Sequence, residues 1–335
     1  MGYKILTLTD HSGHSRENSL YALMRTMLQH SDCESIDVAS RGNAANDGFF
    51  HHFNSTLLQV VNINEDFAFQ SDGRQFLKQT IQRDLKDYDV VMLRLPRPIP
   101  VGFFDFLRQH FPEKRIVNRP SGIEVTSSKA YLLNFPDICP PIELCDSVEV
   151  ILQFKERFPI VLKPLRNYGG KGIVRIEGEE VQYGGLKFTF NDFLPILKEN
   201  LAIDGAYLGM KYLKNVSQGD KRVILVNGQI LGASLRLPPE GSWMCNVAQG
   251  GSSVLSEADE QEELIAARIS PYLLEQGIVV CGFDTLVEDD GRRVLSEINT
   301  LSVGGLPQAA KQSGRPVVKQ TVNLIFNYLN TSEKG

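Results

Sequence analysis

Residues 279–299 read VVCGFDTLVEDDGRRVLSEIN, two apolar runs that flank an Asp-Gly pair. Apolar, β-rich runs on both sides of Asp-Gly are a strong signal for a β-hairpin. If Asp290 and Gly291 form a two-residue turn, counting back along both strands places Asp284 directly opposite Glu297. Asn299 follows two residues after Glu297 and therefore shares the same face of the hairpin.

This register places two carboxylates side by side. Directly opposed residues of antiparallel strands have Cβ atoms about 5 Å apart, and two carboxylates at that distance repel by roughly 3 kcal/mol at an effective dielectric of about 20. A bound divalent cation would remove the repulsion, because Mg²⁺ prefers carboxylate and amide oxygens. A solvated hairpin whose register differs by one residue is the alternative, and the hairpin by itself leaves both interpretations open.

The composition bounds the class of protein. The chain has 335 residues, enough for two or three domains, and 42% of them are hydrophobic and 22% charged. A net charge of −5 argues against a general nucleic-acid surface, and no apolar run reaches the length of a membrane span. The N-terminus enters a strand-like run without a signal peptide, and the five cysteines show no CxxC spacing. We therefore expect a cytoplasmic protein that binds neither nucleic acid nor membranes.

Strands alternate with helices in the first third of the chain. The pattern predicts strands at 3–9, 89–95 and 115–118, and helices at 20–29 and 103–110. This alternation is typical of an open α/β sheet, in which ligands bind at the carboxyl ends of the strands. The candidate ligand-binding residues near such ends are Asp10, Asn18, Ser19 and Arg94.

The segment NRPSG at 118–122 interrupts this pattern and predicts a domain boundary. Short helices and strands alternate from 123 to 213, and strands dominate from 220 onward, with helices expected at 256–275 and 316–329. We therefore expect three domains, which span residues 1–122, 123–213 and 214–335.

A glycine-rich loop joins two strands of the second segment. The strand at 160–164 carries Lys163 among apolar residues, and the loop that follows contains Tyr168, Gly169 and Gly170. It is not a Walker A loop, because neither a Ser or Thr after the lysine nor a helix after the glycines is present. Such a hairpin can still present backbone N–H groups to phosphates, with Lys163 as a compact cation. An ordinary hairpin with a mobile tip is the alternative.

A second hairpin brings two arginines together. Its strands flank Asn227-Gly228, and Arg222 alternates with apolar residues, so its charge needs an anionic partner. Arg236 returns to the same region on the second strand. The two arginines could clamp a carboxylate or phosphoryl group, or form two structural salt bridges. A Pro- and Gly-rich loop at 237–251 follows and contains Asn246, a candidate ligand of phosphate or metal.

The order of these features resembles the ATP-grasp superfamily, and within it the bacterial type of glutathione synthetase. The likeness rests on NRP at 118–120, LKPL at 162–165 with Gly169-Gly170, GDKRV at 219–223 and EIN at 297–299, and it spans roughly residues 87–320. It implies an α/β ATP-grasp fold with an N-terminal open α/β domain, an α+β lid and a C-terminal, mainly antiparallel sheet. It also implies an ATP-dependent carboxylate–amine ligase that joins γ-glutamylcysteine and glycine through an acyl-phosphate.

The same resemblance implies roles for individual residues. The residues expected to bind ATP are Lys129, Lys163, Tyr168, Gly169, Gly170, Lys211, Tyr212, Leu213, Asp220 and Asn246. Two Mg²⁺ ions would be bound by Asp284, Glu297 and Asn299, and Arg222 and Arg236 would stabilise the transferred phosphoryl group as catalytic residues. The residues expected to contact the other small-molecule substrates are Asn18, Ser19, Arg94, Ser302, Gly304 and Gly305. We further expect a homo-oligomer.

Two segments depart from the family pattern. Met244-Cys245-Asn246 stands where the family usually has Arg-Gly-Asn, and TLSVGG at 300–305 replaces a segment that carries Thr-Ser-Pro-Thr. The resemblance implies that both segments border the pocket for the acyl substrate. Two alternatives therefore stay open: an ATP-grasp ligase for a different amino acid or short peptide, and a non-catalytic ATP-binding protein.

Overall fold

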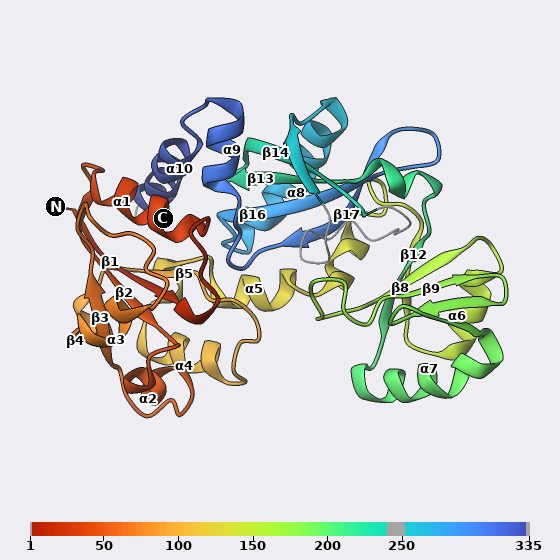
Figure 1. Ribbon diagram of the computed structural model, residues 1–335, viewed down its shortest axis with the longest axis horizontal. Helices are drawn as coiled ribbons and strands as arrows, with labels where there is room; N and C mark the ends of the chain where they lie inside the picture. Colours follow the sequence, from red (N-terminus) through yellow and green to blue (C-terminus); the bar gives the residue numbers. More distant parts are fainter. Residues whose placement is uncertain (1, 240–251, 333–335) are drawn as a thin grey trace.

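The computed structural model describes residues 2–239 and 252–332, which form three β-sheets with helices packed around them (Figure 1). Met244, Asn246 and Gly250-Gly251 lie outside the described residues. Within the described residues, no helix is long and apolar enough to cross a membrane.

The N-terminal part is an open α/β unit whose six-stranded sheet has the order β4-β3-β2-β1-β5-β6. Strands β2, β1, β5 and β6 run parallel, whereas β3 and β4 join antiparallel. The strands are β1 (Tyr3–Thr9), β2 (Cys33–Ser40), β3 (Leu57–Asn62), β4 (Ile81–Asp84), β5 (Val90–Leu93) and β6 (Ile116–Val117). The helices are α1 (Ser19–Leu28), α2 (Asp47–Phe50), α3 (Arg74–Lys78) and α4 (Phe103–His110). The elements predicted here are confirmed to within two residues.

The second sheet forms the lid, drawn in green in Figure 1, and is antiparallel throughout, with the order β11-β10-β9-β8-β12-β7. Its strands are β7 (Ile142–Cys145), β8 (Ile160–Pro164), β9 (Val174–Glu177), β10 (Glu180–Tyr183), β11 (Leu186–Thr189) and β12 (Tyr207–Lys211). Its helices are α6 (Val148–Lys155), capped by Ser147, and α7 (Phe190–Asp204), capped by Thr189. Buried residues of these elements form a core of their own.

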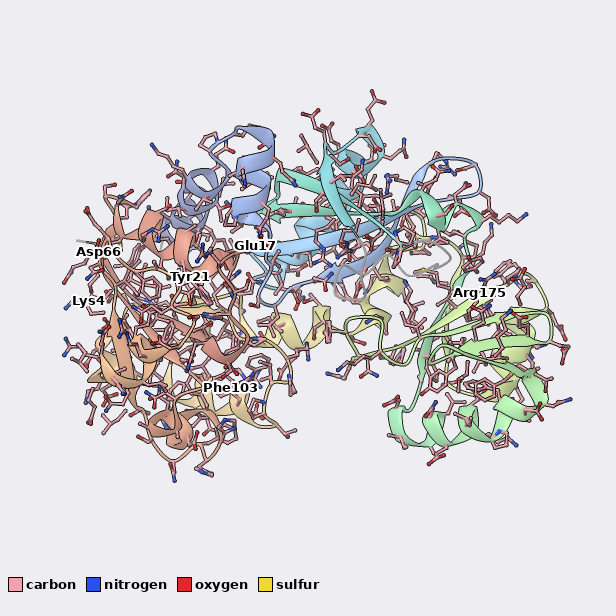
Figure 2. The ribbon with its side chains drawn as sticks, in the orientation of Figure 1. Lys4, Glu17, Tyr21, Asp66, Phe103 and Arg175 are labelled. Carbon is pink, nitrogen blue, oxygen red and sulfur yellow. The ribbon has the colours of Figure 1, made fainter. Side chains whose placement is uncertain are left out.

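The third sheet is also antiparallel and has the order β15-β14-β13-β16-β17. Its strands are β13 (Asp220–Val226), β14 (Gln229–Leu237), β15 (Ser252–Ser256), β16 (Val280–Val287) and β17 (Arg293–Asn299). The helices are α8 (Glu260–Glu275), α9 (Leu306–Ser313) and α10 (Val317–Ser332), of which α9 and α10 pack beside α1 (Figure 1). Two apolar cores run across the first and third units, so these units are packed into one body. Phe103 of α4 is fully buried in one of them (Figure 2).

The expected helix at 256–275 is wrong in its first four residues. The segment up to Ser256 belongs to the edge strand β15, and α8 begins only at Glu260. Asp259 caps this helix by accepting from the backbone N–H of Gln261 and Glu262, and the Glu262 side chain accepts from the N–H of Asp259 in return. This capping box is a start signal that apolar periodicity alone does not weigh.

The hairpin of β16 and β17 confirms the pairing of Asp284 with Glu297. The expected two-residue turn is wrong, because Val287 pairs with Arg293 and the residues between them form a longer loop. A β-bulge at Ser296 offsets this one-residue difference and restores the Asp284 register. Without the bulge, Glu297 would lie on the opposite face of the sheet.

The segment predicted as a domain boundary is a structured joint. Asn118 is buried, and its amide donates to the carbonyls of Val280 and Thr300, both at 2.7 Å, and accepts from the N–H groups of Val279 and Val280. Helix α5 (Pro120–Thr126) begins inside this segment, at Pro120. Each proposed domain contains one sheet, and we keep the division at 122 and 213 as a proposal.

Helix α5 packs so closely on the end of α8 that one glycine leaves no room for a side chain. A Cβ added at Gly122 would lie 2.0 Å from the carbonyl oxygen of Gln276. In an unobstructed helix, Gly to Ala stabilises by about 1 kcal/mol. We expect Gly122→Ala to destabilise the protein instead, and to lower the free energy of unfolding by roughly 2 kcal/mol or more, because the backbone at Gln276 or in α5 would have to move.

Urea unfolding followed by circular dichroism measures this effect. Gly13→Ala is the matched control, because nothing lies within 4 Å of a Cβ at Gly13. The control should change the unfolding midpoint little, and a stabilised Gly122→Ala variant would contradict the close packing of α5 on α8.

Candidate active site

A cavity of about 360 Å³ lies between the lid sheet and the C-terminal sheet. Its walls come from β8, β12 and the glycine-rich loop on one side and from β13, β14, β16 and β17 on the other. The lining residues are Lys129, Val161, Lys163, Pro164, Asn167, Tyr168, Gly169, Gly170, Lys171, Ile173, Met210, Lys211, Tyr212, Leu213, Val216, Asp220, Arg222, Arg236, Asp284, Leu286, Ser296, Glu297 and Asn299.

The cavity gathers most of the residues singled out from the sequence. Every described residue expected to bind ATP or metal, and both expected catalytic arginines, are among its lining residues. Asn246 lies outside the described residues. The residues expected to contact the acyl substrate do not line this cavity, and they are Asn18, Ser19, Arg94, Ser302, Gly304 and Gly305.

One end of the cavity is apolar. It is lined by Val161, Ile173, Met210, Leu213, Val216 and Leu286. The guanidinium of Arg175 covers the Tyr212 ring, with its Cζ 3.9 Å from the ring centre. Arg175 is on the part of the lid that faces the rest of the molecule (Figure 2). Lys211 pairs with Glu288 at 2.9 Å and Asp289 at 2.8 Å, which directs its charge to the β16–β17 loop. These features suit a flat, apolar group such as a nucleobase.

The other end of the cavity is cationic. Lys129 Nζ lies 3.3 Å from a carboxylate oxygen of Glu297, and Lys163 Nζ donates to the carbonyl of Ser296 at 3.2 Å. Burial lowers the pKa of Lys163, the charge of Lys129 lowers it further, and Glu297 opposes both effects. Lys129 also donates to the carbonyl of Asn167, so it keeps one of its three N–H groups for a further anion, and Lys163 keeps two.

The balance of charges on the walls favours a polyanionic ligand. The lining residues include six lysines and arginines against three carboxylates, in a chain whose net charge is −5. The pairing of Lys211 with Glu288 and Asp289 reduces this excess but leaves the cavity positive. A cleft with one sign of charge raises the local concentration of oppositely charged ligands.

A buried cluster of four charges forms the floor of the cationic end. Asp284 is 2% exposed and accepts from Arg222 through both oxygens, and Arg236 Nη2 donates to Asp284 Oδ2 at 2.8 Å. Arg236 also binds Asp220 through two hydrogen bonds of 2.7 and 2.6 Å. Burial raises the pKa of Asp284, but the two guanidinium groups outweigh it and hold the pKa below its usual value. Burial and the neighbouring Asp284 raise the pKa of Asp220.

The sequence left two interpretations open for Arg222 and Arg236, an anion clamp and a pair of structural salt bridges. The structure combines both. Arg222 pairs directly with Asp284 across β13 and β16, so strand register fixes the salt bridge. Both guanidinium groups are nonetheless lining residues of the cavity. They are held in place by carboxylates while they face the space that an anion would enter.

The oxygen donors expected to bind a metal are on one side of the cavity. Asp284 and Glu297 are cross-strand neighbours, and Asn299 Nδ2 lies 3.5 Å from Asp284 Oδ2. In the part of the chain that the structure describes, no group of three His, Cys, Asp or Glu side chains could bind a metal ion. Two carboxylates and an amide nevertheless suit Mg²⁺, which commonly takes one or two protein carboxylates and completes its shell with phosphate and water oxygens. Glu297 is the more accessible carboxylate, because Asp284 is occupied by both arginines.

The residues of the N-terminal unit differ in their surroundings. Arg94 follows β5 and is buried, and its Nε has no hydrogen-bond partner among the described residues. Burial lowers its pKa to about 10. The Ser302 hydroxyl donates to the Arg94 carbonyl at 3.1 Å. Asn18 caps α1 by accepting from Leu20 N–H, and the buried Ser19 hydroxyl accepts from Leu306 N–H at 3.3 Å, so both side chains have structural partners.

The sequence analysis did not single out several apolar lining residues or Ser296. Val161 is two residues before Lys163 on β8, so strand alternation could have placed it on the same face. No local signal marks the bulge at Ser296 or the closeness of Leu286 to the lid, because both depend on how the strands pair and the sheets pack.

Comparison with known proteins identifies the family. The family model of the prokaryotic glutathione synthetase ATP-grasp domain matches residues 128–314. A glutathione synthetase of Bradyrhizobium diazoefficiens is 30% identical over 72% of this chain and 74% of the relative. One of Parasynechococcus marenigrum is also 30% identical, over 72% of this chain and 76% of the relative.

Solved structures share the fold. The D-cycloserine synthetase DcsG has a TM-score of 0.64 at 12% identity, with 96% of this chain and 98% of that chain covered. A D-alanine-D-alanine ligase from Coxiella burnetii has a TM-score of 0.63 at 12% identity, with 99% and 96% covered. These matches confirm the expected α/β ATP-grasp fold. The chain therefore belongs to the prokaryotic glutathione synthetase family of ATP-grasp enzymes and is an ATP-dependent ligase that forms C–N bonds.

Proposed function

We propose that this ligase joins γ-glutamylcysteine to glycine. The observation that carries the proposal is the single cavity in which Lys129, Lys163, the arginine pair and the Asp284–Glu297 pair surround one space beside an apolar end. The relatives named glutathione synthetase support the choice of substrates. The family assignment leaves the non-catalytic alternative without support.

The reaction would proceed in two balanced steps. A carboxylate oxygen of the dipeptide attacks the γ-phosphorus of ATP, and ADP leaves with the electrons of the broken P–O bond. The amine of glycine then attacks the acyl carbon, the C–N bond forms, inorganic phosphate leaves, and the amine loses a proton. Catalysis of such transfers rests on positioning and on stabilising negative charge.

Each charged group of the cavity would have a part in these steps. Lys129 and Lys163 would neutralise phosphate oxygens, and Arg222 and Arg236 would stabilise the charge that develops on the transferred phosphoryl group. Asp220 and Asp284 already orient both guanidinium groups, so little reorganisation is needed at the moment of reaction. Asp284, Glu297 and Asn299 would hold two Mg²⁺ ions, whose positive charge would offset that of the phosphates.

Arg94 would bind a carboxylate of the acyl donor. It lies at the carboxyl end of β5, next to β1, on the edge where parallel sheets bind ligands. A buried guanidinium without a carboxylate partner is costly unless an anion joins it. The substrate would supply that anion, and Ser302 would position the backbone of Arg94.

A substrate screen tests the proposal directly. Purified protein with ATP, Mg²⁺, γ-glutamylcysteine and glycine should release one phosphate for each amide bond formed. Omission of either substrate should reduce phosphate release to background, and the product should be confirmed by mass spectrometry. Absence of turnover with this pair would reject the proposed substrates.

A second candidate is the same chemistry on another amino acid or short peptide. Nothing lies within 4 Å of a Cβ at Gly304, so this part of the substituted segment at 300–305 has free space. The same phosphate-release assay across pairs of amino acids and dipeptides separates the candidates. A higher kcat/KM for a different pair would favour the second.

Replacement of Arg94 should separate stability from substrate binding. We expect Arg94→Met to raise the KM for the acyl donor by about 30-fold or more, because a buried charge partner of a substrate carboxylate is lost. The KM for ATP should stay within about threefold, because Arg94 does not line the ATP-sized cavity. The free energy of unfolding should be equal or higher, since the substitution removes a buried charge that has no carboxylate partner among the described residues. A destabilised variant with unchanged KM would assign Arg94 a purely structural role.

Replacement of Glu297 tests the metal site. Glu297→Gln keeps the shape and removes the charge, so we expect kcat/KM to fall by about 100-fold or more and the Mg²⁺ concentration for half-maximal rate to rise. Asp290→Asn is the control, because Asp290 is exposed at the tip of the same hairpin and pairs with Arg292. Equal effects of the two variants, or an unchanged Mg²⁺ requirement in Glu297→Gln, would contradict this site.

A further inference from the structure

The loop that follows β5 reaches from the N-terminal unit to the lid. Arg97 in this loop places its Cζ 4.6 Å from the centre of the Tyr168 ring, in the glycine-rich loop. Arg97 is half-buried, and among the described residues its buried Nε has no hydrogen-bond partner and no carboxylate forms an ion pair with it. The guanidinium of Arg97 therefore contacts the face of the Tyr168 ring while it is partly desolvated, a setting in which cation–π attraction is strongest.

Tyr168 is held from other directions as well. Its hydroxyl donates to the carbonyl of Ser127 at 2.9 Å, at the end of α5. Lys129 Nζ lies 5.1 Å from the ring centre and donates to the carbonyl of Asn167. One side chain of the glycine-rich loop thus contacts three segments outside the lid sheet.

The rest of the loop has a backbone suited to motion. Gly169, Gly170 and Gly172 have φ values of 68°, 76° and 74°, in the left-handed region that favours glycine. Arg166 and Lys171 are exposed. The position of the loop over the cavity therefore depends strongly on how Tyr168 is anchored.

We propose that Arg97 and Tyr168 form a latch that holds the glycine-rich loop over the cavity from the N-terminal unit. Arg97 is then a positioning residue, because it does not line the cavity and acts through Tyr168. Arg97 is three residues after Arg94, so the same short loop carries the proposed acyl-donor contact and the latch. The inference rests on the proposed function only for the identity of the ligands that the loop covers.

Limited proteolysis by trypsin tests the latch without any acyl substrate. The loop contains two exposed cleavage sites, Arg166 and Lys171, whereas the Arg97-Pro98 bond resists trypsin. In the full-length protein with ATP and Mg²⁺, we expect Arg97→Gln to speed cleavage within the loop by about fivefold or more, as loss of a partly buried cation–π contact implies. Arg97→Lys, which keeps a cation, should give an intermediate rate.

The matched control is Arg157→Gln. Arg157 also lies over aromatic rings, 5.2 Å from the centre of Phe154 and 5.1 Å from that of Phe158, but these rings belong to the lid core and its surface. Its loss should leave cleavage within 166–172 unchanged. A wild-type cleavage rate in Arg97→Gln, or an equal increase in the control, would overturn the latch.

A kinetic readout separates positioning from general weakening of the structure. With both substrates present, an open loop exposes the acyl-phosphate to water, so Arg97→Gln should release more than one phosphate for each amide bond. A ratio that stays at one in Arg97→Gln would overturn the link between latch and catalysis. Faster loop cleavage in a protein that does not use γ-glutamylcysteine would reject the proposed substrates and support the latch.

Discussion

The buried contact of Asp284 with Arg222 and Arg236 is the constraint on which the rest of the site depends. Removing one partner of such a cluster leaves an uncompensated charge, so the strands that carry it must keep their register. Arg222 sits opposite Asp284 because β13 pairs with β16, and Glu297 sits opposite Asp284 because a bulge corrects the register of β17. The floor of the cavity is thus specified by backbone pairing.

The division of the apolar core explains why a cavity exists at this place. The N-terminal and C-terminal units share two cores and are joined by the fully hydrogen-bonded Asn118, whereas the lid has a core of its own. The lid also joins the body, because Leu208 and Met210 of β12 belong to one of the shared cores and Lys129, Lys163 and Tyr168 add polar contacts. The cavity lies at this junction, where the lid sheet meets the C-terminal sheet.

Four arginines at or near the site fall into two pairs. Arg222 and Arg236 pair with carboxylates at the cavity, whereas Arg94 and Arg97 each have a buried Nε without a hydrogen-bond partner in the part of the chain that the structure describes. The charges of Arg222 and Arg236 are balanced by the carboxylates of Asp284 and Asp220 within the fold. The second pair lies in one loop after β5 and depends on groups brought by a ligand or by the glycine-rich loop, which makes this loop the connection between the two halves of the proposed reaction.

The sequence by itself determined the alternation of elements, the hairpin at 279–299 and the order of motifs that identifies the ATP-grasp family, whereas the facing of Asp284 and Glu297 also needed the bulge at Ser296. These depend on local periodicity, turn residues and spacing, which a single chain displays directly. Only the tertiary structure decided that Arg222 and Arg236 converge on Asp284, that Ser19 bonds to Leu306, and that Arg97 reaches Tyr168. The physical reason is that these contacts join residues 48 to 287 positions apart. Their geometry follows from strand pairing, a bulge and the packing of separate units, none of which leaves a local pattern in the sequence.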